Sequence, residues 1–207
     1  MTRYRYVHLL GILHSLFAIG LLSLLGCGRP PGLGIGGQYL DGRAEVIRQR
    51  GNIKQSVVKL EEVDRKDPFY RDSLTLLGRA YYKDSRYRDA LQLLKRALAV
   101  KEEDEIAWLT LGLAQLRLGD DEYGLKSVKG GLTLLGRVSK EGYRGYAHWD
   151  RNGSVRAALR RAVLEATRGL EEKRRIIQST EALLARVDEE AQLQEREAAL
   201  ATQESGT

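Results

Sequence analysis

The stretch RDSLTLLGRAYYKDSRYRDALQLLKRALAVKEED, residues 71–104, decides the fold of this chain of 207 residues. Its apolar residues recur every three or four positions, which is the spacing of amphipathic α-helices. Small residues at Gly78, Ala90 and Ala97 would let neighbouring helices approach closely, and a large residue such as Leu94 would fill the space beside them. The stretch therefore predicts helices packed at short range.

The same pattern returns 34 residues upstream and 34 residues downstream. A fixed period of this length is the signature of a repeat architecture. The third copy is weakened by three glycines, each of which lowers helix propensity by about 1 kcal/mol. The units are 37–70, 71–104 and 105–138, and the glycines are Gly124, Gly130 and Gly131. The aligned positions are Leu40, Leu74 and Trp108; Leu77–Gly78 and Leu111–Gly112; Ser56, Ala90 and Gly124; Leu60, Leu94 and Val128; Val63, Ala97 and Gly131.

This pattern resembles the tetratricopeptide repeat (TPR), a helix-turn-helix unit that stacks into a solenoid, and the resemblance covers about half of the chain. It implies an all-α, TPR-like solenoid of about three units over residues 37–138. The residues at the family's signature positions in the second unit are Leu74, Leu77, Gly78, Tyr81, Tyr87, Ala90, Leu94 and Ala97.

In this family the first helix of each unit lines a concave groove that binds proteins. Carried over residue by residue, the resemblance implies a protein-binding groove formed by Asp72, Thr75, Arg79, Tyr82, Lys83, Leu109, Leu113 and Leu116. The same rule adds Gln38, Asp41, Glu45, Arg48 and Gln49 from the first unit, and Ile106 and Arg117 from the third. The groove is thus expected to change from charged to apolar along its length.

The apolar strip at Leu109, Leu113 and Leu116 needs a cover, because large apolar patches are seldom left in water. One hypothesis is that the helix after residue 153 folds back over the strip, as the ends of solenoids require. The other is that a segment of a partner protein lies there, with residues such as Arg79 fixing its polar side. The sequence leaves both open.

The C-terminal part begins with an aromatic connector, residues 139–153, which either packs on the last repeat or forms a binding loop. Residues 154–203 contain no proline and one glycine, Gly169, and they carry a heptad-like apolar stripe. They predict a single long amphipathic helix with Ser154 as its N-cap. We expect residues 155–187 to pack on the repeats or to pair with a second copy as a coiled coil.

The N-terminal residues 1–26 have the composition of a secretory signal peptide. Arg3 and Arg5 precede residues 9–26, which carry no charged side chain. A basic start followed by an apolar run of this length is typical of a signal segment. The Gly- and Pro-rich residues 27–36 then predict a flexible tether.

The residues Leu24-Leu25-Gly26-Cys27 resemble the lipobox of bacterial lipoproteins. The resemblance implies cleavage after Gly26, diacylglycerol on the Cys27 sulfur and an acyl chain on the new amino group. Two or more acyl chains anchor a protein stably. The protein would then be anchored to the cell membrane, and to the periplasmic side of the outer membrane in a Gram-negative source. A buried thiol and an uncleaved signal anchor stay open as alternatives.

The rest of the sequence argues against catalysis, metal binding and nucleic-acid binding. Beyond residue 26 the chain has one histidine, His148, and its one cysteine is Cys27, whose sulfur would carry the lipid; this removes cysteine-histidine pairs and most transition-metal sites. Gly32, Gly34 and Gly37 match G-x-G-x-x-G, but prolines precede them where a nucleotide site needs a strand. The basic residues are spread along the chain, whereas nucleic-acid binding needs a basic stripe. We expect no catalytic residue, cofactor or metal.

These observations predict a membrane-anchored TPR adaptor that binds protein partners and serves in the assembly or scaffolding of a cell-envelope complex. The alternative is a structural coiled-coil oligomer, in which the C-terminal helix pairs and the repeats act as a spacer. Neither hypothesis makes the protein an enzyme.

Overall fold

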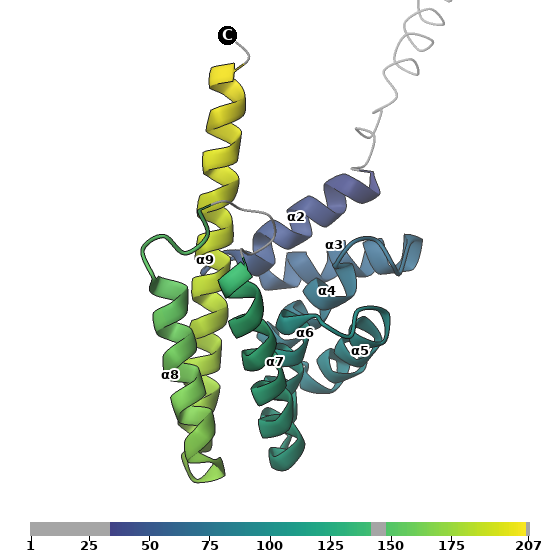
Figure 1. Cartoon of the computed structure of the whole chain (residues 1–207). Helices are drawn as coiled ribbons and strands as arrows, with labels where there is room; N and C mark the ends of the chain where they lie inside the picture. Colours follow the sequence, from purple (N-terminus) through teal and green to yellow (C-terminus); the bar gives the residue numbers. More distant parts are fainter. Residues whose placement is uncertain (1–33, 142–147, 206–207) are drawn as a thin grey trace, which may run out of the picture. The chain divides into compact units, whose positions relative to one another are not determined.

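Figure 1 shows the chain in a computed structural model, which describes residues 34–141 and 148–205. Within these ranges the chain forms helices and turns and has no strand. The predicted signal peptide, Cys27 and most of the predicted tether lie outside the described residues. In the described part of the chain, no helix has both the length and the apolar character needed to span a membrane.

Three consecutive helix pairs make up the first part of the fold, and each pair is one helix-turn-helix unit. The two helices of a unit pack on each other, and α3 packs on α4 as α5 packs on α6. This confirms the predicted all-α, TPR-like solenoid. The pairs are α2 (Ile35–Ile47) with α3 (Ile53–Lys66), α4 (Ser73–Lys83) with α5 (Tyr87–Val100), and α6 (Glu105–Leu118) with α7 (Asp121–Glu141).

Asp104 fixes the start of α6 and its position beside α4. Its carboxylate accepts hydrogen bonds from the backbone N–H groups of Ile106 and Ala107, at 3.1 and 2.9 Å, as an N-cap residue does. The same carboxylate accepts a buried hydrogen bond of 2.8 Å from the Thr75 hydroxyl. One side chain therefore caps a helix and joins two units.

Glycines allow α6 and α7 to pack at short range, as the repeat pattern indicated. A Cβ at Gly131 would lie 2.7 Å from the Cγ atom of Leu109, and a Cβ at Gly124 would lie 2.7 Å from that of Leu116. Both leucines fill the space that the missing side chains leave. These glycines lower helix propensity, yet α7 runs for 21 residues through them because close packing outweighs that cost.

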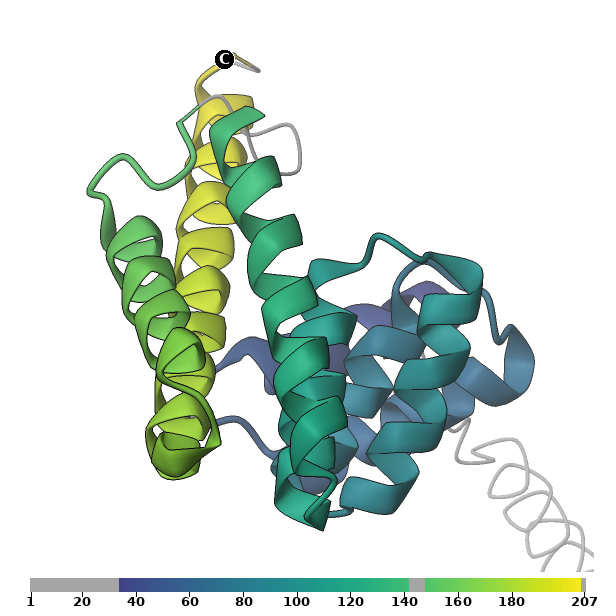
Figure 2. The same ribbon diagram turned by 60° about the horizontal axis from the view of Figure 1, so that its bottom comes forward.

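The C-terminal part ends in a long helix, as predicted, but the prediction of a single helix over 154–203 is wrong because two helices form there. Helix α8 (Ser154–Arg168) is followed by a short 3₁₀ turn at Leu170–Glu172 and by α9 (Lys173–Ser205). Between α8 and the turn, Gly169 has φ 86° and ψ −172°, a backbone region that is nearly restricted to glycine. The chain reverses there, and α8 packs along α9 (Figure 2).

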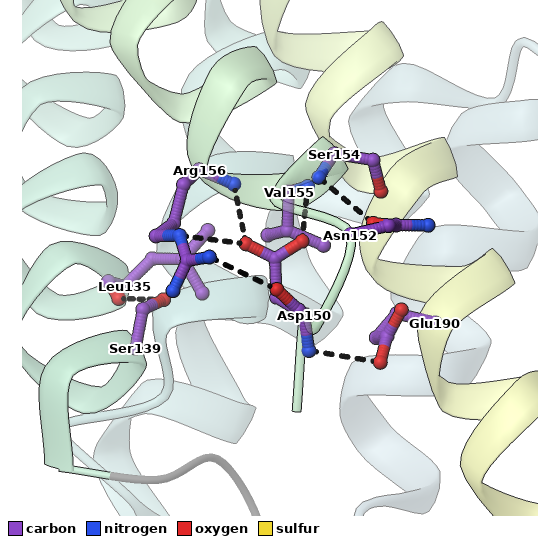
Figure 3. A network of polar contacts seen from close by, with 8 residues as sticks. All are labelled: Leu135, Ser139, Asp150, Asn152, Ser154, Val155, Arg156 and Glu190. Atoms are coloured by element: carbon purple, nitrogen blue, oxygen red, sulfur yellow. Dashed lines mark hydrogen bonds and ion pairs between the residues drawn. The ribbon is translucent and has the colours of Figure 1, made fainter. Parts of the chain in front are cut away.

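Asp150 organises the start of α8, which the sequence assigned to Ser154. Asp150 is 1% exposed, and its carboxylate accepts hydrogen bonds from the N–H groups of Val155 (2.8 Å) and Arg156 (2.9 Å). Its own N–H donates to the carboxylate of Glu190 on α9 at 2.8 Å (Figure 3). Ser154 is instead the first residue of α8, so the cap comes from four residues further upstream.

The described part of the aromatic connector contributes one buried ring. Trp149 is buried, whereas His148 is exposed. Tyr143 and Tyr146 lie outside the described residues. The connector also begins later than predicted, because α7 continues to Glu141.

Replacing the adjacent glycines Gly130 and Gly131 of α7 by alanine should change the free energy of unfolding in opposite directions. Gly131→Ala places a methyl group 2.7 Å from Leu109 Cγ and 2.8 Å from its backbone nitrogen, so we expect a loss of about 1–2 kcal/mol in the free energy of unfolding. At Gly130 no heavy atom lies within 4 Å of the place that a Cβ would take, so Gly130→Ala should gain about 0.5–1 kcal/mol. Urea unfolding of the two variants tests this, and equal shifts would contradict the packing.

Candidate protein-binding groove

Five predicted groove residues come together at the start and along one side of α4. They connect this helix with α2, with the start of α6 and with α9, so their side chains point to the inside of the solenoid. The five residues are Asp72, Thr75, Arg79, Tyr82 and Lys83. Their polar partners are, in the same order, the Tyr39 hydroxyl, Asp104, Asp188, Glu181 and the Val46 carbonyl.

Helix α9 occupies this groove, and it contacts the first helix of every unit. Each contact joins an arginine of a repeat to a carboxylate of α9. The pairs are Arg43 of α2 with Glu195 (2.5 Å), Arg79 of α4 with Asp188 (2.6 Å) and Arg117 of α6 with Glu181 (2.9 Å). The chain of α9 therefore runs from the third unit to the first.

The spacing of the three carboxylates matches the spacing of the units. Glu181, Asp188 and Glu195 are seven residues apart, which corresponds to about 10.5 Å along a helix. Packed helices have axes about 8–10 Å apart, so one heptad of α9 spans about one neighbouring first helix. The arginines are separated by 36 residues (79 − 43) and 38 residues (117 − 79) and not by 34, so α9 crosses the units obliquely.

The middle pair is buried and the outer pairs are partly open to water. Arg79 and Asp188 are each 6% exposed. By contrast, the side chains of Arg117 and Glu181 are 39% and 36% exposed. A buried charge that loses its partner is far more costly than an exposed one. The Arg79–Asp188 pair is therefore the contact that determines the position of α9.

Tyr82 completes the contact at the third unit. Its hydroxyl donates to the carboxylate of Glu181 and accepts a hydrogen bond of 3.3 Å from Nε of Arg117. Burial raises the pKa of Tyr82 above its ordinary value, and the Glu181 carboxylate adds to this shift. The phenol thus stays protonated and keeps donating to Glu181 well above neutral pH.

The apolar strip predicted for the groove lies in the core. Leu109, Leu113 and Leu116 are all 0% exposed. Leu109 and Leu116 face the glycines of α7, and α9 packs against α6. Helix α7 of the same unit therefore covers Leu109 and Leu116, whereas the C-terminal segment folds back on the groove beside them. This corrects the expectation that these leucines form an open binding surface.

A pocket of about 470 Å³ remains between α9 and the ends of α2 and α4. Tyr87, Leu184 and Ala185 form part of its apolar wall. Basic side chains outnumber acidic ones around it, so the pocket favours an anionic group. The charged lining residues are Arg48, Arg79, Lys83 and Arg117 against Glu181 and Asp188.

Lys83 is the unusual cation of this pocket. Its ammonium donates to the Val46 carbonyl, near the C-terminal end of α2. Burial of the ammonium and, to a smaller extent, the charge of Arg79 together lower the pKa of Lys83 to about 8, while the Asp188 carboxylate opposes the shift. Among the ion pairs of the described residues, none includes Lys83.

Sequence reasoning missed the groove contacts that come from outside the expected positions. Arg43 stands where the repeat pattern has leucine, so by sequence it is a weak point of the first unit. The sequence alone likewise gives no reason to place Glu181, Asp188 and Glu195 in the groove, because carboxylates are expected on the polar face of a helix. Their seven-residue spacing is visible in the sequence and could have indicated a helix that binds across the repeats.

The groove is built to hold a helix, and the described residues contain no group of three or more His, Cys, Asp and Glu side chains that could hold a metal ion. Residues 78–119, from within α4 to the end of α6, match the family model of the TPR repeat. A comparison with curated proteins gives no match. The TPR repeat supports a role in protein–protein interaction, and such repeats are typically non-catalytic.

The central and outer ion pairs differ in what their loss should cost. Asp188→Ala leaves the Arg79 guanidinium buried without a counter-charge, so we expect the free energy of unfolding to fall by about 3–5 kcal/mol. Glu195→Ala leaves Arg43, whose side chain is 16% exposed and still reaches water, so the loss should be smaller, at about 1–2 kcal/mol. Urea unfolding measures both values.

A double variant serves as the control for this comparison. Arg79→Met combined with Asp188→Leu removes both charges and should recover most of the stability that Asp188→Ala loses, because two apolar side chains can replace a buried pair. Similar losses for Asp188→Ala and Glu195→Ala would contradict the burial of the central pair.

The pH dependence of stability should report the environment of Lys83. Its pKa is about 8 in the folded chain, below the ordinary value, so between the two values the unfolded state binds the additional proton. The contribution of Lys83 to the free energy of unfolding therefore rises from pH 8 towards pH 10. We expect this rise in the difference between the unchanged chain and Lys83→Met, measured by urea unfolding across this range. Parallel curves for the two chains would contradict it.

Proposed function

We propose that this protein is a lipid-anchored adaptor that binds protein partners at a membrane of the cell envelope, in the assembly or scaffolding of an envelope complex. The observation that carries the binding role is the groove, which holds a helix through one arginine-carboxylate contact in each unit. The match of residues 78–119 to the TPR repeat supports the same role.

The proposed anchor rests on the lipobox-like residues around Cys27 and on the basic, apolar segment before them. Helix α2 begins at Ile35, eight residues after Cys27. Eight extended residues reach at most about 28 Å. A lipid on Cys27 would therefore keep the repeats close to the membrane surface, where a partner in the same membrane is at high local concentration.

Most of the surface that the alternative, a coiled-coil oligomer, would use for pairing is buried within the chain. Of the apolar stripe expected to pair two copies, Ala166, Ile177 and Leu184 are buried within the chain, and Val163 at its start is exposed. Helix α9 makes its contacts with α8 and with the repeats. The adaptor is therefore the function that the arrangement supports better.

Loss of the proposed lipidation site should release the protein from membranes. We expect the unchanged chain to enter the detergent-rich phase on phase separation, and Cys27→Ser to stay in the aqueous phase, because the thioether needs the sulfur. Ser23→Ala changes the same segment without touching residues 24–27 and should behave like the unchanged chain. Detergent-phase partition of Cys27→Ser would refute the anchor.

Cross-linking in intact membranes, with the same variants, tests whether the protein binds a partner protein there. The unchanged chain should give a cross-linked product with an envelope protein, and the yield should fall for Cys27→Ser because the two partners no longer share a surface. A chain that is anchored but forms no cross-link with another protein would leave the anchor in place and remove the adaptor role.

A further inference from the structure

We propose that the groove is a docking surface for an acidic amphipathic helix of the partner, with carboxylates at intervals of seven residues, and that α9 is the chain's own copy of this ligand. The inference rests on the proposed adaptor function and specifies the chemistry that the partner presents. It follows from the contacts that α9 makes and from the pocket that it leaves.

The first step is that the spacing of the three arginines matches carboxylates on one face of a helix. Arg117, Arg79 and Arg43 come from three consecutive units, and in this order they meet carboxylates at the first, eighth and fifteenth positions of residues 181–195 of α9. A helix repeats its orientation almost every seven residues, so such a segment presents all three carboxylates on one face. An extended peptide would move about 23 Å over seven residues and would miss two of the arginines.

The second step concerns the residues between the carboxylates. Leu184, Val187 and Ala191 of α9 are each 7% exposed or less, so apolar side chains fill the groove between the ion pairs. Val187 and Ala191 lie beside Ile106 of α6 and Leu76 of α4 around a small cavity. The ligand that fits is therefore an amphipathic helix and not a uniformly acidic one.

The third step is that α9 leaves part of the groove unused. The pocket of about 470 Å³ has Ala185 on its wall, and Lys83 and Arg48 are also among its lining residues. A methyl group cannot reach across a space of that volume or pair with an ammonium. A partner helix with glutamate at the position of Ala185 would place a fourth carboxylate in this pocket.

This unused pocket explains how a partner could compete with a tethered helix. Helix α9 is part of the same chain, so its effective concentration at the groove is high. A partner binds only if it makes contacts that α9 lacks. The pairing of a carboxylate with Lys83 is such a contact, and it would form within the groove that α9 occupies.

The test uses the full chain in detergent and a fluorescent synthetic peptide with the sequence of residues 177–199 carrying Ala185→Glu. The chain carries Glu181→Gln and Glu195→Gln, which weaken the hold of α9 at both ends and keep the buried Arg79–Asp188 pair. By fluorescence anisotropy this chain should bind the peptide about ten-fold or more tightly than the unchanged chain does. A peptide in which all three carboxylates are replaced by amides should bind about ten-fold or more weakly.

Lys83 provides the matched control for the pocket. With Lys83→Gln added to the chain, the peptide with Ala185→Glu should bind no better than the peptide that keeps Ala185, which gives a double-mutant cycle for one contact. Equal binding of the charged and amide peptides would overturn the proposal. So would an advantage of Ala185→Glu that persists after Lys83→Gln.

A measurement within one chain keeps the proposal testable if the weakened chain does not fold, which circular dichroism reports. Ala185→Glu in the otherwise unchanged chain should raise the urea midpoint, and Lys83→Gln should abolish the rise. No rise in the midpoint would overturn the fit of a carboxylate to the pocket. Failure of the peptide to bind, together with a membrane cross-link to a protein, would remove the acidic-helix specificity and leave the adaptor function standing.

Discussion

The ion pair between Arg79 and Asp188 joins the middle repeat to the last helix, and both side chains are buried. Removing two charges from water is costly, so such a pair is tolerated only in the geometry where each charge meets the other. A shift of α9 by one turn would leave Arg79 buried without its carboxylate. The pair therefore selects one register for α9, and the outer pairs at Arg43 and Arg117 follow from that register.

Two repeat distances are nearly equal in this groove: the distance between neighbouring first helices of the units, and the rise of α9 over seven residues. The repeats advance by one pair of helices, about 8–10 Å between neighbouring first helices, while α9 advances about 10.5 Å in seven residues. Because the two lengths are nearly equal, one helix can contact every unit with the same kind of side chain. The small difference between the two distances is accommodated because α9 crosses the units obliquely. Its contacts are with Arg43, Arg79 and Arg117, which lie at different positions in successive first helices. A helix that follows this path has its carboxylates at positions that the solenoid itself dictates.

Local preference is overruled in two places by packing between helices. Helix α7 passes through Gly124, Gly130 and Gly131, although each of these glycines disfavours a helix, because two of them let Leu109 and Leu116 pack against its backbone. The chain from Ser154 onward is rich in helix formers on both sides of Gly169, and a single glycine need not end a helix, as α7 shows; the chain turns there because α8 can then bury Val155, Ala162 and Ala166. In each case burial of apolar surface decides the outcome.

The sequence by itself determined the repeated unit, because its 34-residue period of small and large apolar residues is a local property of each helix pair. It also identified Arg79, Tyr82 and Lys83 as groove residues, since their place in the repeat sets the direction of their side chains. Only the tertiary structure decided what fills the groove: Asp188 meets Arg79 across 109 residues of chain, through a reversal at Gly169 that no period predicts. Contacts at such separation depend on the path of the backbone, and a pattern of neighbouring residues does not contain that path.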